Sequence, residues 1–181
     1  MGYIFVIRGK IKMKDYFDSI KRRDLAARSV LQIILLYPGV QAFFWYKAAN
    51  YLYKKGLRFL PEAIMYLVRC LLNIEIHPAA TIGKRLFIDH GTGVVIGATA
   101  LIGDDVTIYH GVTLGAVGKG AVPGAKRHPT VENNVVIGAG AKILGDITLG
   151  KDSYIGANAV VLKDVPPGIT AVGIPAVLKF K

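Results

Sequence analysis

The chain has 181 residues, and its 23 Lys and Arg against 12 Asp and Glu give a formal net charge of +11 at pH 7. A length of this order suits one compact unit, or a small helical domain joined to one solenoid domain. Hydrophobic residues make up 52% of the chain, but the best candidate for a span, residues 30–46, is broken by two glutamines, a proline and a glycine. A membrane-spanning helix needs about 18 nearly uninterrupted apolar residues, so we expect no membrane span and no membrane partner.

Positive charge is concentrated in the first part of the chain. Residues 1–75 carry 13 Lys and Arg against 5 Asp and Glu, whereas residues 76–181 carry 10 against 7. A basic surface can bind nucleic acid, an anionic membrane or a polyphosphate cofactor, or it is simply a solvated face. No nucleic-acid-binding motif accompanies the charge, so we rank the solvated face first and a polyphosphate cofactor second, and we expect no nucleic-acid partner.

Residues 1–14 are predicted to be a leader outside the folded domains. An apolar run over residues 3–7 precedes four basic residues, which is the reverse of the order in a secretory signal. Cys70 is the only cysteine, so no internal disulfide can form, and a reducing compartment is compatible with the chain. We therefore expect a cytoplasmic protein.

Residues 15–74 are predicted to form an α-helical cap. Residues 25–36 have apolar side chains at helical spacing and follow Asp24, a residue type that favours the N-cap position. A second helix is predicted over residues 40–55, where Gly56 ends it. A third is predicted from a proline at position 61, which suits a first helical turn, to about residue 73.

An apolar residue at every sixth position dominates the rest of the chain. The repeat forms three ladders, the second shifted by two residues from the first: Ile76, Ile82, Ile88 and Val94; Ile96, Ile102, Ile108 and Leu114; and Val131, Ile137, Ile143, Leu149, Ile155 and Val161. A period of six fits neither an α-helix nor an alternating strand, and it is typical of the hexapeptide parallel β-helix. One repeat cannot bury its apolar residue alone, so the coils must stack into a continuous core.

The predicted fold is therefore α+β: an N-terminal α-helical cap followed by a left-handed parallel β-helix of hexapeptide repeats over residues 75–175, with one protruding loop. The rhythm lapses after the second ladder, where glycines, prolines and the basic run Lys126-Arg127-His128 predict a loop over residues 115–130. Long loops on rigid scaffolds often carry function. Residues 176–181 are predicted to be a short C-terminal tail.

All four histidines lie in the predicted β-helix or its loop: His77, His90, His110 and His128. Three histidines can form a zinc site between subunits, as in the hexapeptide-repeat carbonic anhydrases. Those enzymes place two of the ligands five residues apart, whereas each histidine here lies much farther along the sequence from the next. We therefore expect no metal site, and structural roles for His77 and His110.

His90 is the candidate catalytic residue. It lies in the polar, glycine-rich stretch Asp89-His-Gly-Thr-Gly93, at somewhat less than the length of one coil after Glu75. A triangular coil takes about 18 residues, so Glu75 and His90 are predicted to lie on adjacent coils near one edge. A carboxylate next to an imidazole fixes its tautomer and stabilises its protonated form, which suits a general base.

Several longer motifs resemble serine O-acetyltransferase in its short bacterial form, within the hexapeptide-repeat acyltransferase superfamily. The resemblance covers nearly all of residues 20–175. Its more specific motifs are Asp-His-Gly-Thr-Gly at 89–93 and Arg-His-Pro at 127–129, and others are Glu-Ile-His-Pro at 75–78 and Tyr-Pro-Gly at 37–39. The repeat alone is typical of the broad superfamily, whereas the first two motifs together are specific to the serine enzyme.

The resemblance implies a role for each matching residue. His90 matches the general base that removes the serine hydroxyl proton, and Glu75 matches its acidic partner. Asp24 and Asp89 match residues that hold the ammonium group of serine. Arg127 matches the residue that binds the serine carboxylate, and His128 is expected to lie beside the substrate. Acetyl-CoA is expected in the cleft between adjacent β-helices, near Gly115, Ala116, Val117, Ala139 and Ala157.

The implied function is acetyl-CoA:L-serine O-acetyltransferase, the first step of cysteine biosynthesis, by direct acetyl transfer without a covalent acyl-enzyme. The expected partners are L-serine, acetyl-CoA and further copies of the chain, in a homotrimer or in two trimers joined through their caps. The alternatives are an O-acetyltransferase for a sugar or another hydroxy-amino acid, and a non-catalytic β-helix that serves as an assembly subunit.

The chain departs from the family pattern in three places. Family members commonly carry Gly-Gly-Thr-Gly-Lys where this chain has Gly115-Ala-Val-Gly-Lys119, and the missing Thr hydroxyl at Val117 is expected to weaken a cofactor contact. The loop from Lys119 to Arg127 is longer than usual in the family, so we expect it to close over the substrate differently. The Phe180-Lys181 ending does not match the Ile with which long-form enzymes dock into cysteine synthase, so we expect no stable complex with that enzyme.

Overall fold

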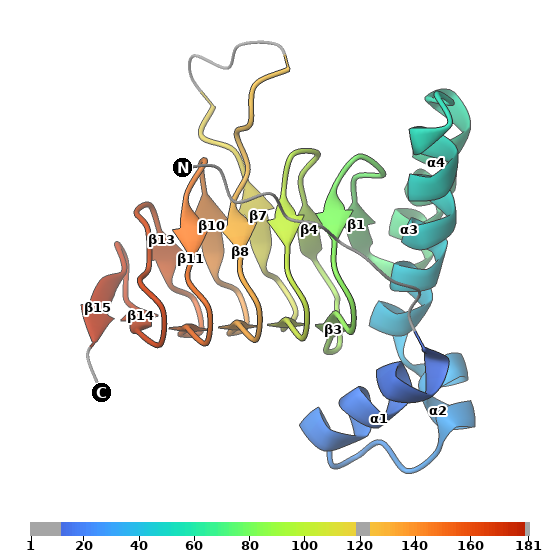
Figure 1. Ribbon diagram of the computed structural model, residues 1–181, viewed down its shortest axis with the longest axis horizontal. Helices are drawn as coiled ribbons and strands as arrows, with labels where there is room; N and C mark the ends of the chain where they lie inside the picture. The colour runs from blue at the N-terminus through green and yellow to red at the C-terminus, as the bar shows by residue number, and fades with distance from the viewer. Residues whose placement is uncertain (1–11, 119–123, 180–181) are drawn as a thin grey trace.

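The computed structural model describes residues 12–118 and 124–179, which form a helical cap at one end of a β-solenoid (Figure 1). The cap contains α1 (Met13–Arg23), α2 (Val30–Leu36), α3 (Pro38–Lys54) and α4 (Phe59–Leu72). α3 and α4 pack side by side against the first coil of the solenoid, and α1 and α2 lie near one end of this pair. No helix in the described ranges is long and apolar enough to span a membrane.

The start of α2 differs from the prediction. Residues 25–29 are not helical, and the hydroxyl of Ser29 caps α2 by accepting a hydrogen bond from the Gln32 N–H at 3.1 Å. The N-cap prediction for Asp24 was therefore wrong. Asp24 follows α1, and its carboxylate accepts a hydrogen bond from the Ala26 N–H at 2.8 Å, a local bond that competes with helix formation.

Both ends of the described chain extend the predicted domains. α1 begins at Met13, inside the segment predicted to be a leader, and residues 1–11 lie outside the described residues. At the other end, β15 (Val177–Lys179) occupies the segment predicted to be a tail. It pairs antiparallel with β14 (Thr170–Val172), whereas the other strand pairs are parallel. The β-structure therefore continues beyond residue 175.

The solenoid is built from three sheets, one for each side of a triangular coil. Sheet A contains β1 (Ile74–Ile76), β4 (Val94–Ile96), β7 (Thr113–Gly115), β10 (Lys142–Leu144) and β13 (Val160–Val161); sheet B contains β2 (Thr81–Ile82), β5 (Leu101–Ile102), β8 (Thr130–Val131) and β11 (Thr148–Leu149); sheet C contains β3 (Phe87–Ile88), β6 (Thr107–Ile108), β9 (Val136–Ile137), β12 (Tyr154–Ile155), β14 and β15. Every apolar residue of the three ladders points inward and is at most 2% exposed. The predicted left-handed parallel β-helix is thereby confirmed.

The pairing register shows where residues are inserted between coils. Ile96 pairs with Leu114 on the next coil, and their separation in the sequence is that of three hexapeptides. Ile76 pairs with Ile96 across a longer coil, and the two extra residues lie in the turn 89–93 between β3 and β4. The described parts of the longer insertion between β7 and β8, residues 116–118 and 124–129, project from the side of the solenoid (Figure 1). The two-residue shift between the first two ladders therefore marks the turn that contains His90.

Gly39 fixes how the cap meets the first coil. A Cβ at this position would overlap the carbonyl oxygen and the Cβ of Ile88, so only glycine lets the start of α3 lie directly against β3. Farther along α3, the hydroxyl of Tyr46 donates a hydrogen bond to the carbonyl oxygen of Ala80 at 2.6 Å. These contacts hold Tyr37, the residue before α3, next to the turn 89–93.

Candidate active site

Two edges of the solenoid contain the candidate residues. The His90 edge joins sheet C to sheet A and consists of residues 89–93, 109–112, 138–141 and 156–159 on successive coils. The loop edge joins sheet A to sheet B and consists of residues 77–80, 97–100, 116–118 with 124–129, and 145–147. Sheet A lies between the two edges, with Glu75 exposed on its outer face.

The backbone of its turn positions His90. His90 has a φ of +58°, in the left-handed region that residues other than glycine rarely adopt. Gly91 follows with a φ of +80°, and a Cβ there would overlap the core side chain of Ile74. The imidazole of His90 is 75% exposed and lies edge-on to the ring of His110 on the next coil, with 5.9 Å between ring centroids. His90 is therefore open to a ligand.

A hollow of about 280 Å³ lies beside His90 and is lined by Asp24 and Tyr37 from the cap and by Asp89 from the turn. The hydroxyl of Tyr37 donates a hydrogen bond to Asp24 at 2.5 Å, and its ring stacks on Phe87. Burial, and then the bond to Asp24, raise the pKa of Tyr37 to about 12, so it stays a hydrogen-bond donor at neutral pH. Two carboxylates at this hollow favour a cationic group, next to an imidazole that can accept a proton.

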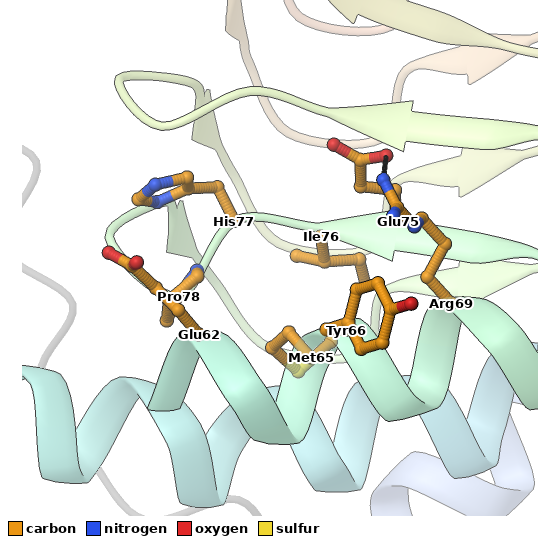
Figure 2. A pocket seen from close by; sticks show the side chains of 8 residues that line it. All are labelled: Glu62, Met65, Tyr66, Arg69, Glu75, Ile76, His77 and Pro78. Carbon is orange, nitrogen blue, oxygen red and sulfur yellow. Dashed lines mark hydrogen bonds and ion pairs between the residues drawn. The ribbon is translucent and has the colours of Figure 1, made fainter. Parts of the chain in front are cut away.

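The predicted pairing of Glu75 with His90 is not present in the structure. The carboxylate of Glu75 instead pairs with the guanidinium of Arg69 on α4 at 3.2 Å (Figure 2), and no hydrogen bond or ion pair joins it to His90 in the described residues. The carboxylate found near His90 is Asp89, with Oδ1 at 3.9 Å from Nε2. Figure 2 shows the Arg69–Glu75 pair at a separate hollow of about 180 Å³ between α4 and β1, which His77 also lines.

Arg127 and His128 lie on the loop edge, at a different corner of the coil from His90. Arg127 is exposed, whereas His128 is only 7% exposed and its ring lies against Gly97. Burial, followed by the charge of Arg127, lowers the pKa of His128. The hydroxyl oxygen of Thr99 holds both residues by accepting hydrogen bonds from their backbone N–H groups at 3.0 and 3.1 Å. One chain therefore does not bring together the two sets of residues that were predicted to bind the substrate.

The predicted cofactor residues divide between the same two edges. Gly115, Ala116 and Val117 lead into the loop edge, where the side chain of Val117 is 58% exposed. Ala139 and Ala157 lie on the His90 edge, two and three turns beyond His90.

Two residues that shape these sites were not predicted as functional: Tyr37 and Thr99. Tyr37 appeared only as part of the Tyr-Pro-Gly motif. No sequence pattern distinguishes Thr99, because its contacts come from a distant segment of the chain. The described residues contain no group of three or more His, Cys, Asp or Glu side chains arranged to hold a metal ion.

The chain is similar in sequence to a transferase family model and to proteins named serine acetyltransferase. The family model for the bacterial transferase hexapeptide (six repeats) matches residues 128–163. A serine acetyltransferase of Mycobacterium tuberculosis is 55% identical over 163 residues, covering 90% of this chain and 70% of that protein. A serine acetyltransferase of Helicobacter pylori is 55% identical over 159 residues, covering 88% of this chain and 91% of that protein.

Solved structures of the same kind are similar in fold. Soybean serine acetyltransferase complexed with serine has a TM-score of 0.86 at 44% identity, over 90% of this chain and 66% of that one. A serine acetyltransferase in complex with CoA has a TM-score of 0.84 at 40% identity, also over 90% of this chain and 66% of that one. The chain thus spans about two thirds of the length of these solved proteins.

Proposed function

The chain belongs to the serine acetyltransferase family, and on this premise we propose that it transfers the acetyl group of acetyl-CoA to the hydroxyl of L-serine, with His90 as the general base. The observation that carries the proposal is the exposed imidazole of His90 beside a hollow lined by Asp24 and Asp89. Serine needs anionic partners for its ammonium group and a base within hydrogen-bond reach of its hydroxyl. Similar proteins solved with serine and with CoA support the two substrates.

In the proposed reaction, His90 accepts the proton of the serine hydroxyl while the serine oxygen attacks the thioester carbonyl of acetyl-CoA. The tetrahedral intermediate collapses by breaking its carbon–sulfur bond, and His90 returns the proton to the departing thiolate. The products are O-acetylserine and CoA, and no covalent acyl-enzyme forms. O-acetylserine is the product expected of the first step of cysteine biosynthesis.

We retain Glu75 as the proposed carboxylate that orients His90. The backbone carbonyl oxygen of Asn73, two residues before Glu75, accepts a hydrogen bond from the Gly93 N–H at 2.7 Å, so the start of β1 adjoins the turn that contains His90. The side chains of the Arg69–Glu75 pair are 47% and 48% exposed. Such surface pairs contribute only about 0.2–1 kcal/mol, so Glu75 can leave Arg69 and turn toward His90 when the imidazole becomes protonated.

We propose that two copies of the chain form each active site. His90 and Asp89 lie on the His90 edge, with Asp24 of the cap at the same hollow, whereas Arg127 and His128 lie on the loop edge. A rigid solenoid cannot bring its own two edges together, but a cyclic assembly places one edge of each copy against the other edge of its neighbour. The cofactor positions divide in the same way, which favours acetyl-CoA in the cleft between neighbouring solenoids. The proposed assembly is a homotrimer.

Two trimers joined through their caps are the alternative assembly. The cap exposes large apolar side chains along α2 and α4, among them Leu31, Leu36, Phe59 and Leu71, which are between 65% and 85% exposed. Extended apolar surfaces of this kind mark protein–protein interfaces more often than solvent-facing sides. Sedimentation of the full chain distinguishes a trimer from a hexamer.

The test of the function is the release of thiol from acetyl-CoA, measured with L-serine and with homoserine and a simple sugar as rival acceptors. The proposal predicts release that depends on L-serine, with O-acetylserine as the product identified by mass spectrometry. Turnover with a rival acceptor but not with serine would overturn the substrate. No turnover with any acceptor, from a folded oligomer, would favour the non-catalytic assembly subunit instead.

A further inference from the structure

Thr99 makes four hydrogen bonds with the adjacent residues Arg127 and His128. Its hydroxyl oxygen lies 2.8 Å from Nδ1 of His128, and its backbone N–H donates to the same nitrogen at 3.2 Å. The hydroxyl oxygen also accepts the backbone N–H groups of Arg127 and His128. One side chain on the second coil therefore anchors both the backbone and the ring of the histidine on the loop.

The direction of the bond between the Thr99 hydroxyl and the His128 ring follows from the available protons and lone pairs. A threonine hydroxyl has one proton and two lone pairs. Both lone pairs of Thr99 face backbone N–H donors, so its proton is left for Nδ1 of His128. Nδ1 thus faces two donors and is the unprotonated nitrogen. A neutral imidazole in this position has its proton on Nε2.

The surroundings of His128 favour the neutral ring. A Cβ on Gly97 would overlap Cδ2 and Nε2, so the imidazole lies against bare backbone and is removed from most solvent. The charged and titratable groups that act on the ring are Arg127, His77 and Lys126, and all three oppose a positive charge on it. Lys126 is itself paired with Asp146. Burial, followed by these charges, lowers the pKa of His128.

The other ring nitrogen of His128, Nε2, makes no hydrogen bond with the described residues. It is also not among the side-chain atoms there that are fully buried without a hydrogen-bond partner. A proton held on Nε2 is therefore not fully enclosed by the described residues, although the ring lies against Gly97. An N–H donor fixed in this way can bind an anionic oxygen without reorganising.

We propose that Thr99 is a positioning residue that locks His128 in its Nε2–H form, so that His128 donates a hydrogen bond to an anionic oxygen of the substrate or of the tetrahedral intermediate. His128 is then a neutral donor and not a second base. This role rests on the proposed function, which places the loop edge of one copy at the substrate on its neighbour.

The tautomer is tested by nitrogen-15 NMR on the full chain with labelled histidine, with a His128→Gln spectrum to assign the ring among the four histidines. The expected result is an unprotonated Nδ1 and a protonated Nε2, with the ring still neutral below the ordinary histidine pKa of about 6.5. A proton on Nδ1, or a ring that titrates at or above that value, would overturn the proposal. This measurement needs no enzymatic activity, so it stands even if serine is not the acceptor.

The positioning role is tested with Thr99→Val, which keeps the shape of the side chain but removes its hydroxyl, and with Thr99→Ser, which keeps the hydroxyl. We expect Thr99→Val to mix the two tautomers and lower kcat/KM for L-serine by as much as about a hundredfold to a thousandfold, the range for losing one preorganised donor. We expect Thr99→Ser to keep both the Nε2–H tautomer of His128 and the wild-type kcat/KM for L-serine. Activity lost in Thr99→Val without a change in tautomer, or retained with a changed one, would overturn the role.

Discussion

The carboxylate of Asp24 is held by two donors at the hollow beside His90. Its Oδ1 accepts the Ala26 N–H at 2.8 Å, and its Oδ2 accepts the Tyr37 hydroxyl at 2.5 Å. A carboxylate offers about four lone-pair sites, so two donors fix its orientation and leave room for an ammonium group. Asp24 does not take the N-cap role because its side chain instead accepts hydrogen bonds from the Ala26 N–H in a local turn and from the Tyr37 hydroxyl.

Asp24→Asn is expected to raise the KM for L-serine by about tenfold or more, because a hydrogen bond to a charged group contributes about 1.5–3 kcal/mol. The KM for acetyl-CoA should change little, since the thioester has no ammonium group. Steady-state kinetics with each substrate varied in turn measure both values. Asp15→Asn, at an exposed position of α1, is the matched control. Equal effects on the two KM values would contradict the role of Asp24.

At the scale of elements, the contact between α3 and β3 sets the distance between the cap and the His90 turn. The backbone of Gly39 touches Ile88, the residue directly before Asp89 and His90. Tyr37 and its partner Asp24 are held by the same contact, on the cap side of the hollow. A shift of α3 would therefore separate the carboxylate of Asp24 from His90.

Gly39→Ala is expected to destabilise the fold by about 1–3 kcal/mol, the usual range for forcing an extra carbon into a packed contact. The urea midpoint measures this change, and the KM for L-serine should rise with it because Asp24 moves. Lys54→Ala, at an exposed position near the end of the same helix, is the control. An unchanged midpoint in Gly39→Ala would mean that α3 does not lie against β3 as described.

At the scale of the whole molecule, the division of the site between two edges predicts complementation between inactive subunits. When His90→Ala and His128→Ala chains are unfolded together in equal amounts and refolded, about one quarter of the sites in a random cyclic assembly combine two intact edges. We therefore expect about a quarter of wild-type activity from the mixture, and almost none from either variant alone. An inactive mixture of assembled, folded oligomers would contradict a site shared between copies.

The stability of the protein is expected to decrease in mildly acidic solution. Burial is the main cause that lowers the pKa of His77 and of His128, so each binds fewer protons in the folded than in the unfolded chain. Their contribution to stability is therefore complete above the ordinary value of about 6.5 and is lost as the pH falls below it. Asp105 affects the stability only at lower pH, because its hydrogen bond with Arg85 lowers the pKa of its carboxyl group.

The urea midpoint measured between pH 7.5 and pH 5 checks this expectation, since this range includes the ordinary histidine pKa of about 6.5. It should fall across this range in the wild type, and the fall should be smaller in His77→Gln and smallest in the double variant with His128→Gln. A midpoint that falls equally in the wild type and in the double variant would assign the loss to other groups.

Most of the solenoid could be predicted from the sequence, because every coil needs an inward apolar residue in each face and the period of six therefore appears in the chain. The two-residue shift between ladders even marked the turn that contains His90, although its meaning required the strand register. His90 and Asp89 could be predicted as candidate site residues because they lie within one short motif at that turn.

The contacts that depend on segments far apart in the sequence could not be predicted. Arg69 holds Glu75 because α4 folds back over β1, and Thr99 holds His128 because the loop returns to the second coil. The placement of Arg127 and His128 on another edge from His90 also needed the three-dimensional coil. The compartment and the oligomeric state stay predictions.

The most direct test of His90 as the general base is kcat/KM for L-serine in His90→Ala beside His110→Ala. The two rings are in contact on neighbouring coils of the same edge, so the variants remove the same group from closely similar surroundings. We predict a loss of about a hundredfold or more in His90→Ala, as for removal of a general base, and only a small change in His110→Ala. Equal losses in the two variants, or full activity without His90, would contradict the proposed mechanism.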